Sequence, residues 1–461
     1  MSDCSNSCDA KRKLRGGHVL PIVALILVSG CAHYKSDPLA TNPSTLAAPD
    51  TSILSRDAQA IERPFLRAQA IDFGQPLDAN AIAVLAVIAN PDLKAMRARL
   101  GVADAQAFSA RLLPDPSFSF NFDHIFSGPD TLGNFVGQLG IDIAALRARK
   151  SLIAGSTAGR EQVRLDIAWA EWQTAGQARL QAVRLVALIK NIGLIRANAV
   201  GAQNLLDRTL RAAGRGDLAA DQVQSARIAA LDAADRLRTA EKDMEVTRGT
   251  LIALLGLPPA TQLRLAPIQM FEPTLESAGL FTIARAERLD LRALAQGYEV
   301  QEAAVRKAVL DQFPTLNITL TATRDPTNNK LFGPGIGFTL PLWNRNRGGI
   351  AVALATRAQL KAEYEARLFQ TRADIAAAVS GILIAQRQRD ELAAQIGALE
   401  RFAIATNRAA KRGDLSRATA ETTAQSLRDK QIALTSVRQA ITEQMIALEL
   451  LTGVPQEDWI K

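Results

Sequence analysis

Few side chains in this sequence are of the types that carry out covalent or metal chemistry. The 461 residues include only three cysteines and three histidines. They are Cys4, Cys8 and Cys31, and His18, His33 and His124. Because no cysteine follows residue 31, the rest of the chain cannot form a disulfide framework, a cysteine metal site or a cysteine nucleophile. The scattered histidines argue against a histidine-built metal or proton-transfer site. No Walker A, HExxH or nucleophile-elbow motif is present, so we expect no enzyme activity, no metal site and no cofactor.

One of the cysteines has a sequence context that gives it a chemical role. Residues 11–15 include four basic side chains and residues 19–28 are apolar, which fits a secretory signal better than a membrane-spanning helix. The following Val28-Ser29-Gly30-Cys31 resembles a bacterial lipobox, in which a peptidase cleaves before the cysteine and the thiol accepts lipid. We therefore expect lipidation of Cys31, with a plain signal peptide as the alternative. By resemblance to bacterial lipoproteins, Ala32 favours sorting to the outer membrane.

The net charge of the chain identifies no partner. The sequence has 54 Lys and Arg against 46 Asp and Glu, which gives a net charge of +8. Removal of the signal would take four basic and two acidic residues and leave +6. Both signs are interspersed without aromatic-basic interleaving, so we expect no nucleic acid partner. Residues 36–50 are rich in Pro, Ser, Thr and Ala and are predicted to form a flexible tether.

The sequence repeats itself after 197 or 198 residues. The matching segments are Pro91-Asp92-Leu93 with Leu289-Asp290-Leu291, residues 137–150 with 335–348, Arg215-Gly216-Asp217-Leu218 with Arg412-Gly413-Asp414-Leu415, and residues 254–258 with 450–455. Four matches in the same order indicate a tandem duplication.

Each copy is predicted to contain a helix, two strands, a long helix, a tight turn and a further helix. The first helix, at 80–112, ends before Pro114 and Pro116, because proline cannot continue a helix. The other elements of the first copy are strands at 117–122 and 135–143 and helices at 144–213 and 218–256. In the second copy, strands are predicted at 315–321 and 336–342, with a loop at 325–329 and a long helix at 345–410.

Both strand pairs alternate apolar and small polar side chains. Phe118, Phe120 and Phe122 lie on one face of the first strand, and Ser or Asn residues lie on the other. This alternation is typical of a membrane β-barrel and also of a half-buried soluble hairpin; the signal segment favours the barrel. Four strands cannot close a barrel, and lipid does not tolerate open edges, so several chains would have to combine.

The long helices carry heptad patterns. Apolar and small residues recur at intervals of three and four in residues 185–213, and in the same register in residues 382–410. This spacing predicts coiled-coil packing. The helices at 80–112 and 218–256 together match the length of the helix at 144–213. We therefore expect the two short helices to be stacked end to end along the long one.

The lipobox, the tandem repeat, the paired strands and the heptad helices together resemble the TolC family of outer-membrane efflux proteins, over about residues 80–455. The resemblance implies a mainly α fold with membrane β structure. In that fold, a homotrimer forms one 12-stranded β-barrel from four strands per chain, continued by a long coiled-coil α-barrel in the periplasm. It also implies a passive exit duct of a tripartite efflux system, anchored in outer-membrane lipid and joined to an inner-membrane pump through a periplasmic adaptor.

The resemblance also assigns roles to residues near the two helix-helix turns. The turns are expected at the periplasmic tip, where the adaptor would dock. They comprise Gly214, Arg215, Gly216, Asp217 and Leu218, and Arg412, Gly413, Asp414 and Leu415. Glycine is needed in such a turn in any case, and Asp217 and Asp414 are expected to cap the returning helices.

A channel constriction is expected just after these turns. Many members of the family carry acidic residues there, but this sequence has Thr419 and Thr422 at the expected positions, with Glu421 beside them and Asp221 in the first copy. These four residues are the candidates for the constriction. Trp343 is the candidate membrane-interface anchor, whereas Trp169 and Trp172 are expected to serve packing.

The predicted organisation has six parts. They are a lipoprotein signal peptide at 1–30, a tether and N-terminal equatorial segment at 31–79, the first repeat at 80–256, an equatorial linker at 257–286, the second repeat at 287–453 and a tail at 454–461. The Leu113-Pro114-Asp115-Pro116 segment resembles the heavy-metal cation branch of the family. Drug efflux and type I protein secretion are alternatives. A lipid-anchored periplasmic scaffold or adaptor without a pore would explain the heptads but not the two matching strand pairs.

Overall fold

The computed structural model describes residues 34–41, 50–129, 132–267 and 276–459. The predicted signal peptide and lipidation site Cys31 lie outside the described residues. The chain divides into two units, Met1–Ala47 and Ala48–Lys461. Residues 34–41, the described part of the first unit, contain neither helix nor strand, and the second unit is described below.

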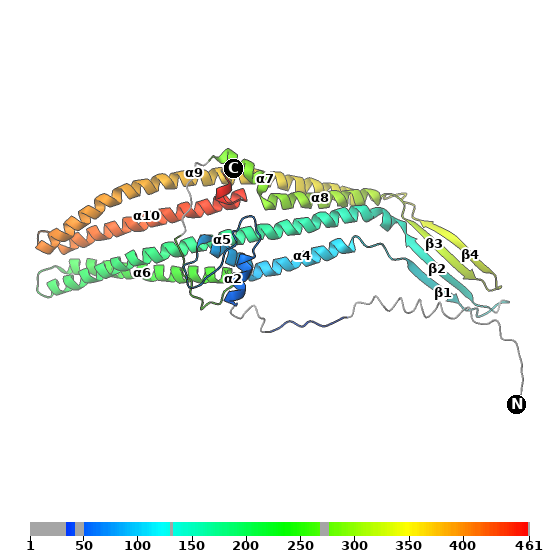
Figure 1. Cartoon of the computed structure of the whole chain (residues 1–461), viewed down its shortest axis with the longest axis horizontal. Helices are drawn as coiled ribbons and strands as arrows, with labels where there is room; N and C mark the ends of the chain where they lie inside the picture. The colour runs from blue at the N-terminus through cyan, green and yellow to red at the C-terminus, as the bar shows by residue number, and fades with distance from the viewer. Residues whose placement is uncertain (1–33, 42–49, 130–131, 268–275, 460–461) are drawn as a thin grey trace, which may run out of the picture. The chain divides into compact units, whose positions relative to one another are not determined.

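The elements of the second unit follow the order that the duplication predicts (Figure 1). α2 (Thr51–Gln59) precedes the first copy, which contains α3 (Ala79–Ala89), α4 (Pro91–Ser109), β1 (Ser117–Asp123), β2 (Asn134–Asp142), α5 (Ile143–Ala213) and α6 (Ala220–Leu254). α7 (Ser277–Glu287) lies in the linker, and the second copy contains α8 (Leu289–Leu310), β3 (Leu316–Arg324), β4 (Lys330–Phe338), α9 (Arg347–Arg412) and α10 (Arg417–Thr452), followed by a short 3-10 turn (Gln456–Asp458).

The first helix of the first copy is broken, which the sequence analysis did not predict. The helix predicted at 80–112 is α3 and α4, which meet at an angle of 52°. Asn90 lies between them with an extended backbone (ψ 123°), because Pro91 disfavours a helical conformation in the residue before it. The Asn90 side chain caps α4 by accepting a hydrogen bond from the Leu93 N–H at 3.0 Å.

The last strand lies earlier in the sequence than predicted. β4 starts at Lys330 and ends at Phe338, so Leu340 and Leu342 lie beyond it. The predicted loop at 325–329 is a tight turn in which the Asp325 N–H donates to the Asn329 carbonyl at 3.1 Å. Strand pairing therefore resumes at once, with Lys330 opposite Arg324. Pro341 has no N–H to extend the ladder at the other end.

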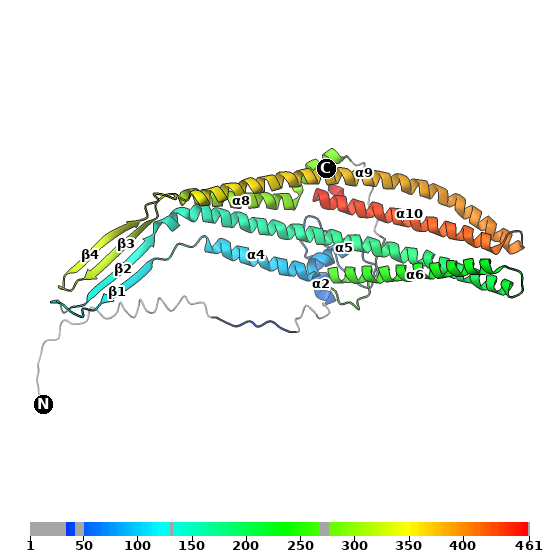
Figure 2. The ribbon, with the colours of Figure 1, turned by 180° about the vertical axis from the view of Figure 1, so that it is seen from behind.

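The short helices are stacked along the long ones, as predicted. The helices α3, α4 and α6 all pack against α5, and α7, α8 and α10 pack against α9 (Figures 1 and 2). The Asn90 Nδ2 donates to the Leu254 carbonyl at the end of α6 at 2.9 Å. The corresponding contact in the second copy joins Arg288 Nη1 to the Leu451 carbonyl at 3.4 Å. The two copies therefore close the same joint with different side chains.

A glycine in the left-handed conformation follows the helix in each of these joints. Gly256 has φ +61° and Gly453 has φ +80°. A Cβ atom at Gly256 would collide with the Ala89 carbonyl oxygen, and one at Gly453 would lie 2.9 Å from the Arg288 Cα. Glycine is therefore required both for the backbone conformation and for the close approach of the helices.

Gly216 and Gly256 share the left-handed backbone conformation but differ in the space around them, so the same substitution should have different effects at the two positions. Gly216, in the turn after α5, has φ +82° but open space around its Cβ position. We expect Gly216→Ala to lower the free energy of unfolding by about 1 kcal/mol, and Gly256→Ala to lower it by about 3 kcal/mol because the collision is added to the strain. Thermal unfolding followed by circular dichroism compares the two. Equal losses would show that the joint relaxes without cost.

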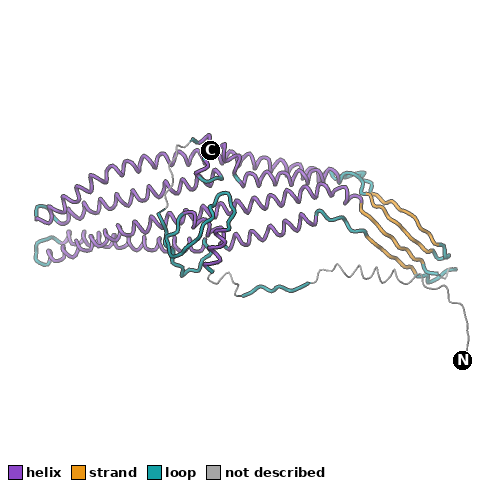
Figure 3. The backbone as a smooth tube through the Cα atoms, viewed as in Figure 1, coloured by secondary structure: helices purple, strands orange, loops and turns teal. Residues whose placement is uncertain are grey.

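The four strands form one antiparallel sheet in the order β1-β2-β3-β4. The sheet joins the two copies, because β2 of the first pairs with β3 of the second, for example Leu139 with Leu320. All four strands lie at one end of the helices, and both helix-helix turns lie at the other (Figure 3). Among the described residues, no strand pairs with the outer edge of β1 or of β4.

The apolar core lies at the middle of the helices and not in the sheet. One cluster contains most of α3, packed against α2, α5 and α6; Ile82, Val84 and Leu85 are fully buried there. A second cluster joins α7, α9 and α10 around Ile382 and Met445. We refer to this level as the belt. It comprises α2, α3 and α7 and the parts of the longer helices at the same height.

By length and composition alone, two of the described helices, α5 and α9, could cross a membrane. The bent pair α3–α4 would be a third candidate if it is counted as one span. The 71 and 66 residues of α5 and α9 correspond to about 107 and 99 Å at about 1.5 Å per residue. This is more than three times the roughly 30 Å of a bilayer core. Their length therefore fits a wall that extends away from a membrane.

Candidate functional site

The two faces of the sheet differ in polarity in the way a membrane barrel requires. In an antiparallel ladder, paired residues share a face. Phe118, Leu139, Leu320 and Pro334 follow one another across the four strands on one face, and Ser119, Gln138, Thr321 and Gly333 follow on the other. Phe118 is 72% exposed, so the described residues do not cover this part of the apolar face. The sheet thus presents one side suited to lipid and another suited to water.

The two helix-helix turns have the same hydrogen bonding at equivalent positions. The Asp217 N–H donates to the Ala212 carbonyl, and the Asp414 N–H to the Ala409 carbonyl, both at 3.0 Å. Gly216 and Gly413 provide the left-handed residue that this closure needs.

The expected capping role of Asp217 and Asp414 is not observed. Each carboxylate instead accepts a hydrogen bond from the arginine two residues earlier, Arg215 or Arg412, at 2.9 Å in both turns. α10 is capped by Ser416, which accepts from the Thr419 N–H, and α6 has no side-chain cap. The turn is tight enough to place the aspartate before the first helical turn, closer to its arginine than to the helix N–H groups.

The tip residues predicted to dock an adaptor are solvent-accessible. Gly214, Arg215 and Asp217 are exposed, as are Arg412 and Asp414. Leu218 is 36% and Leu415 is 40% exposed, so each turn presents one apolar side chain beside an Arg–Asp pair.

The candidates for the constriction separate into two groups. Asp221, Thr419 and Thr422 are exposed near the starts of α6 and α10. Glu421 is instead directed at α5: its carboxylate occupies the space where a Cβ of Gly201 would stand, and it pairs with Arg428. Glu421 is thus neutralised inside the chain, and the two threonines are the exposed pair at this level of α10.

Arg428 extends this contact between the two copies. Its Nε donates to the Asn198 Oδ1 on α5, and Asn198 Nδ2 donates to Asp429 Oδ1 at 3.0 Å. A hollow of about 500 Å3 lies beside the cluster, between α5, α9 and α10, with Arg208, Glu400 and Arg417 in its lining. Sequence reasoning missed this cluster, because Asn198 and Arg428 are 230 residues apart in the chain.

Trp343 lies where the sequence placed it, between the last strand and the long helix. It follows β4 and precedes α9, and 87% of its surface is exposed. Its role as an interface anchor remains a prediction. By contrast, Trp172 is almost completely buried against the Phe65 ring, with the ring centroids 4.9 Å apart, so its predicted packing role is confirmed.

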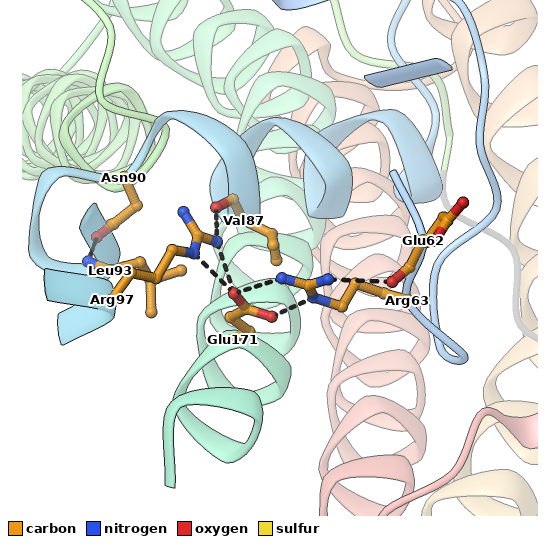
Figure 4. A network of polar contacts seen from close by, with 7 residues as sticks. All are labelled: Glu62, Arg63, Val87, Asn90, Leu93, Arg97 and Glu171. Atoms are coloured by element: carbon orange, nitrogen blue, oxygen red, sulfur yellow. Dashed lines mark hydrogen bonds and ion pairs between the residues drawn. The ribbon is translucent and has the colours of Figure 1, made fainter. Parts of the chain in front are cut away.

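The belt contains a buried ionic network that sequence reasoning missed (Figure 4). Glu171 of α5 is 1% exposed and accepts hydrogen bonds from Arg63 of the N-terminal segment and from Arg97 of α4. The Arg97 Nη2 also donates to the Val87 carbonyl at 2.6 Å, across the α3–α4 kink. The hydrogen bond to Glu171 raises the pKa of Arg63 above its usual range. The Glu171 carboxylate therefore links α5 to the N-terminal segment and to α4.

The second copy has its own buried ion pairs at the same level. Arg288 binds both carboxylate oxygens of Asp290 at 2.8 Å and lies over the Trp169 ring at 5.2 Å. Arg179 of α5 reaches Glu449 of α10 at 2.7 Å. Trp169 and Arg179 both belong to α5, so the middle of this helix holds the two copies together.

Among the described residues, no group of three or more His, Cys, Asp or Glu side chains could hold a metal ion. The arrangement is therefore a two-faced sheet, a long helical wall, a belt fixed by ion pairs, and two tips with the same turn.

The chain is similar in sequence to an outer membrane efflux family and to a metal resistance protein. Residues 280–454, most of the second copy, match the family described as outer membrane efflux protein. The chain is 24% identical over 314 residues to the cobalt-zinc-cadmium resistance protein CzcC of Cupriavidus metallidurans, covering 64% of this chain and 71% of CzcC.

Solved structures share the fold over most of the chain. The outer membrane protein VceC of Vibrio cholerae has a TM-score of 0.67 at 18% identity, covering 82% of this chain and 96% of VceC. The CmeC outer membrane channel of Campylobacter jejuni has a TM-score of 0.70 at 16% identity, covering 92% of each chain.

Proposed function

Since the chain is an outer-membrane efflux protein of the TolC family, we propose that three copies form a passive exit duct from the periplasm to the outside. The observation that carries this proposal is the four-stranded sheet, apolar and exposed on one face, polar on the other and open at both edges. A bilayer does not accept unpaired strand edges. Closure by three chains removes every edge, and the long helices then continue the wall into the periplasm.

The duct supplies no energy of its own. An inner-membrane pump would drive cargo through it, joined by an adaptor that docks on the two tip turns, with Leu218 and Leu415 as apolar contacts beside the Arg–Asp pairs. Selectivity in such a channel comes from its width and lining. The protein would be anchored by lipid at Cys31 and held at the membrane surface by Trp343.

Heat-sensitive migration tests the assembly. Outer-membrane fractions run without heating should show a trimer that becomes a monomer on boiling, and the purified trimer should conduct ions in a planar bilayer. A monomer that washes off the membrane after removal of its lipid would instead identify a periplasmic scaffold.

Divalent metal cations are the cargo class that we propose. The support is the similarity to CzcC, a cobalt-zinc-cadmium resistance protein. Deletion of the gene should increase sensitivity to these cations more than to dyes and antibiotics. The opposite order would favour drug efflux, and retention of a secreted protein in the cell would favour type I secretion.

The exposed threonines of α10 are proposed to line the narrowest part of the duct. The mature chain would have no free thiol, because Cys4 and Cys8 leave with the signal and Cys31 is lipidated. A disulfide requires Cβ atoms about 4 Å apart, a distance that neighbouring chains reach only where the duct is narrow. In a trimer carrying Thr422→Cys, we therefore expect oxidation to join neighbouring chains and to reduce the conductance by more than half.

Glu421→Cys is the matched control for this experiment. The side chain at 421 is directed at Gly201 of its own chain, so oxidation should join few chains and leave the conductance unchanged. Denaturing gels without reductant give the extent of cross-linking. Equal cross-linking of both variants would contradict the orientation of α10 that we propose.

A further inference from the structure

Two cations stand next to each other on the apolar face of the sheet. Arg324 is the last residue of β3 and Lys330 is the first of β4, and the two are paired in register. Arg324 is also paired with Phe135 of β2. Paired residues share a face, so both cations continue the apolar stripe at the end of the sheet that carries the strand turns, away from the helices.

Neither charge is neutralised by the residues that the structure describes. The Arg324 Nε donates to the Asn328 amide oxygen at 3.0 Å, and its guanidinium lies 5.9 Å from the centre of the Phe135 ring. Neither cation forms an ion pair with a described carboxylate; the neighbouring Asp325 accepts its hydrogen bonds from Thr327 and Asn329. Like charges directly opposite each other in a ladder are destabilising. An anion bound between the two cations would attract both of them and so offset their mutual repulsion.

An apolar hollow of about 450 Å3 leads to these cations. Gly137 and Ala322, paired in register, leave room at its floor because both side chains are small. Phe120 of β1, Phe135 of β2 and Phe332 of β4 line it together with Thr323 and Leu331, and the paired Arg324 and Lys330 line its outer end. The lining therefore changes from apolar to cationic along one direction.

We propose that this hollow binds a phosphorylated glycolipid of the outer leaflet, with one acyl chain between the phenylalanines and a phosphate on Arg324 and Lys330. The inference rests on the proposed function, which places this face against lipid and this end at the outer surface. The planar guanidinium binds phosphate oxygens in pairs, and the ammonium adds a point charge. Basic residues at a membrane surface are the usual partners of anionic headgroups.

The test uses the purified trimer and diphosphorylated lipid A as the probe, with retained lipid counted by native mass spectrometry over a titration. The double variant R324Q/K330Q should bind about 30-fold more weakly, at about fivefold for each basic side chain lost. Ala322→Phe should also weaken binding, because it fills the hollow while keeping both charges. R367Q/R372Q removes two exposed charges from α9 and should bind as the wild type does.

Each outcome decides the proposal. Unchanged lipid binding in R324Q/K330Q would overturn it, as would unchanged binding in Ala322→Phe if that trimer assembles. Competition by millimolar inorganic phosphate that displaces all the lipid would show an anion site without a lipid chain and would also overturn it. If the wild type forms a conducting trimer while these variants bind normally, only this inference fails. If the wild type forms no membrane trimer, the proposed function fails, and this inference fails with it.

Discussion

Leu320→Arg is expected to remove the trimer from the outer membrane. Leu320 lies near the middle of β3, paired with Leu139 on one side and Pro334 on the other, on the apolar and exposed face of the sheet. An arginine on the lipid face of a barrel at mid-depth costs about 2–4 kcal/mol. Three copies per trimer would raise this to roughly 6–12 kcal/mol, which is comparable with the whole stability of a typical domain.

Thr321→Arg is the matched control, one residue further along the same strand. Thr321 is on the polar face, between Gln138 and Gly333, where the Cβ position of the glycine is free. An arginine there would stay in water, so the trimer should form in normal amounts and its channel should favour anions more than the wild type does. Heat-sensitive migration and ion selectivity measure the two effects. Equal loss, or equal tolerance, of both variants would mean that the sheet does not meet lipid and is a soluble hairpin pair.

The regular parts of this fold could be predicted because each carries a repeated signal. Period-two alternation marked the strands, heptads marked the long helices, and the recurrence of Arg-Gly-Asp-Leu placed the two turns at equivalent points. The end-to-end stacking followed from lengths alone. These features depend on local sequence and on the duplication, so no knowledge of distant contacts was needed.

The belt could not be predicted in the same way. Glu171 is one of two glutamates in α5, and nothing local in the sequence distinguishes a buried carboxylate from a solvated one. Its partner Arg63 belongs to a segment without periodicity, 108 residues away. Glu421 shows the same difficulty at the tip, because its direction is set by Gly201 and Arg428 and not by the turn that precedes it.

The break between α3 and α4 was not predicted either, but for a different reason. Pro91 was visible in the sequence, and the residue before a proline avoids the helical region. The apolar pattern on both sides concealed the break, because α3 is buried on nearly all sides and has no polar face to interrupt. A buried helix therefore gives a weaker boundary signal than an amphipathic one.

Glu171→Gln is expected to cause a large loss of stability in the helical part of the chain. The substitution keeps the shape of the side chain but leaves Arg63 and Arg97 facing a neutral group in a site where Glu171 was 1% exposed. Removal of one partner from a buried ion pair costs about 3–5 kcal/mol. Because the two arginines are 38% and 31% exposed and keep part of their hydration, we expect the lower end of this range, about 3 kcal/mol.

Glu443→Gln is the control that separates burial from charge. Glu443 pairs with Arg184 at 2.9 Å between α10 and α5, and this hydrogen bond raises the pKa of Arg184, but the arginine side chain is 46% exposed. Its loss should cost about 1 kcal/mol or less. Denaturant unfolding of the purified trimer, followed by the fluorescence of its tryptophans, compares the two variants. Equal and small losses would show that water already screens Glu171. A large loss only in Glu171→Gln, partly restored by Glu171→Asp, would instead establish that this carboxylate fixes the N-terminal segment and the α3–α4 kink to α5.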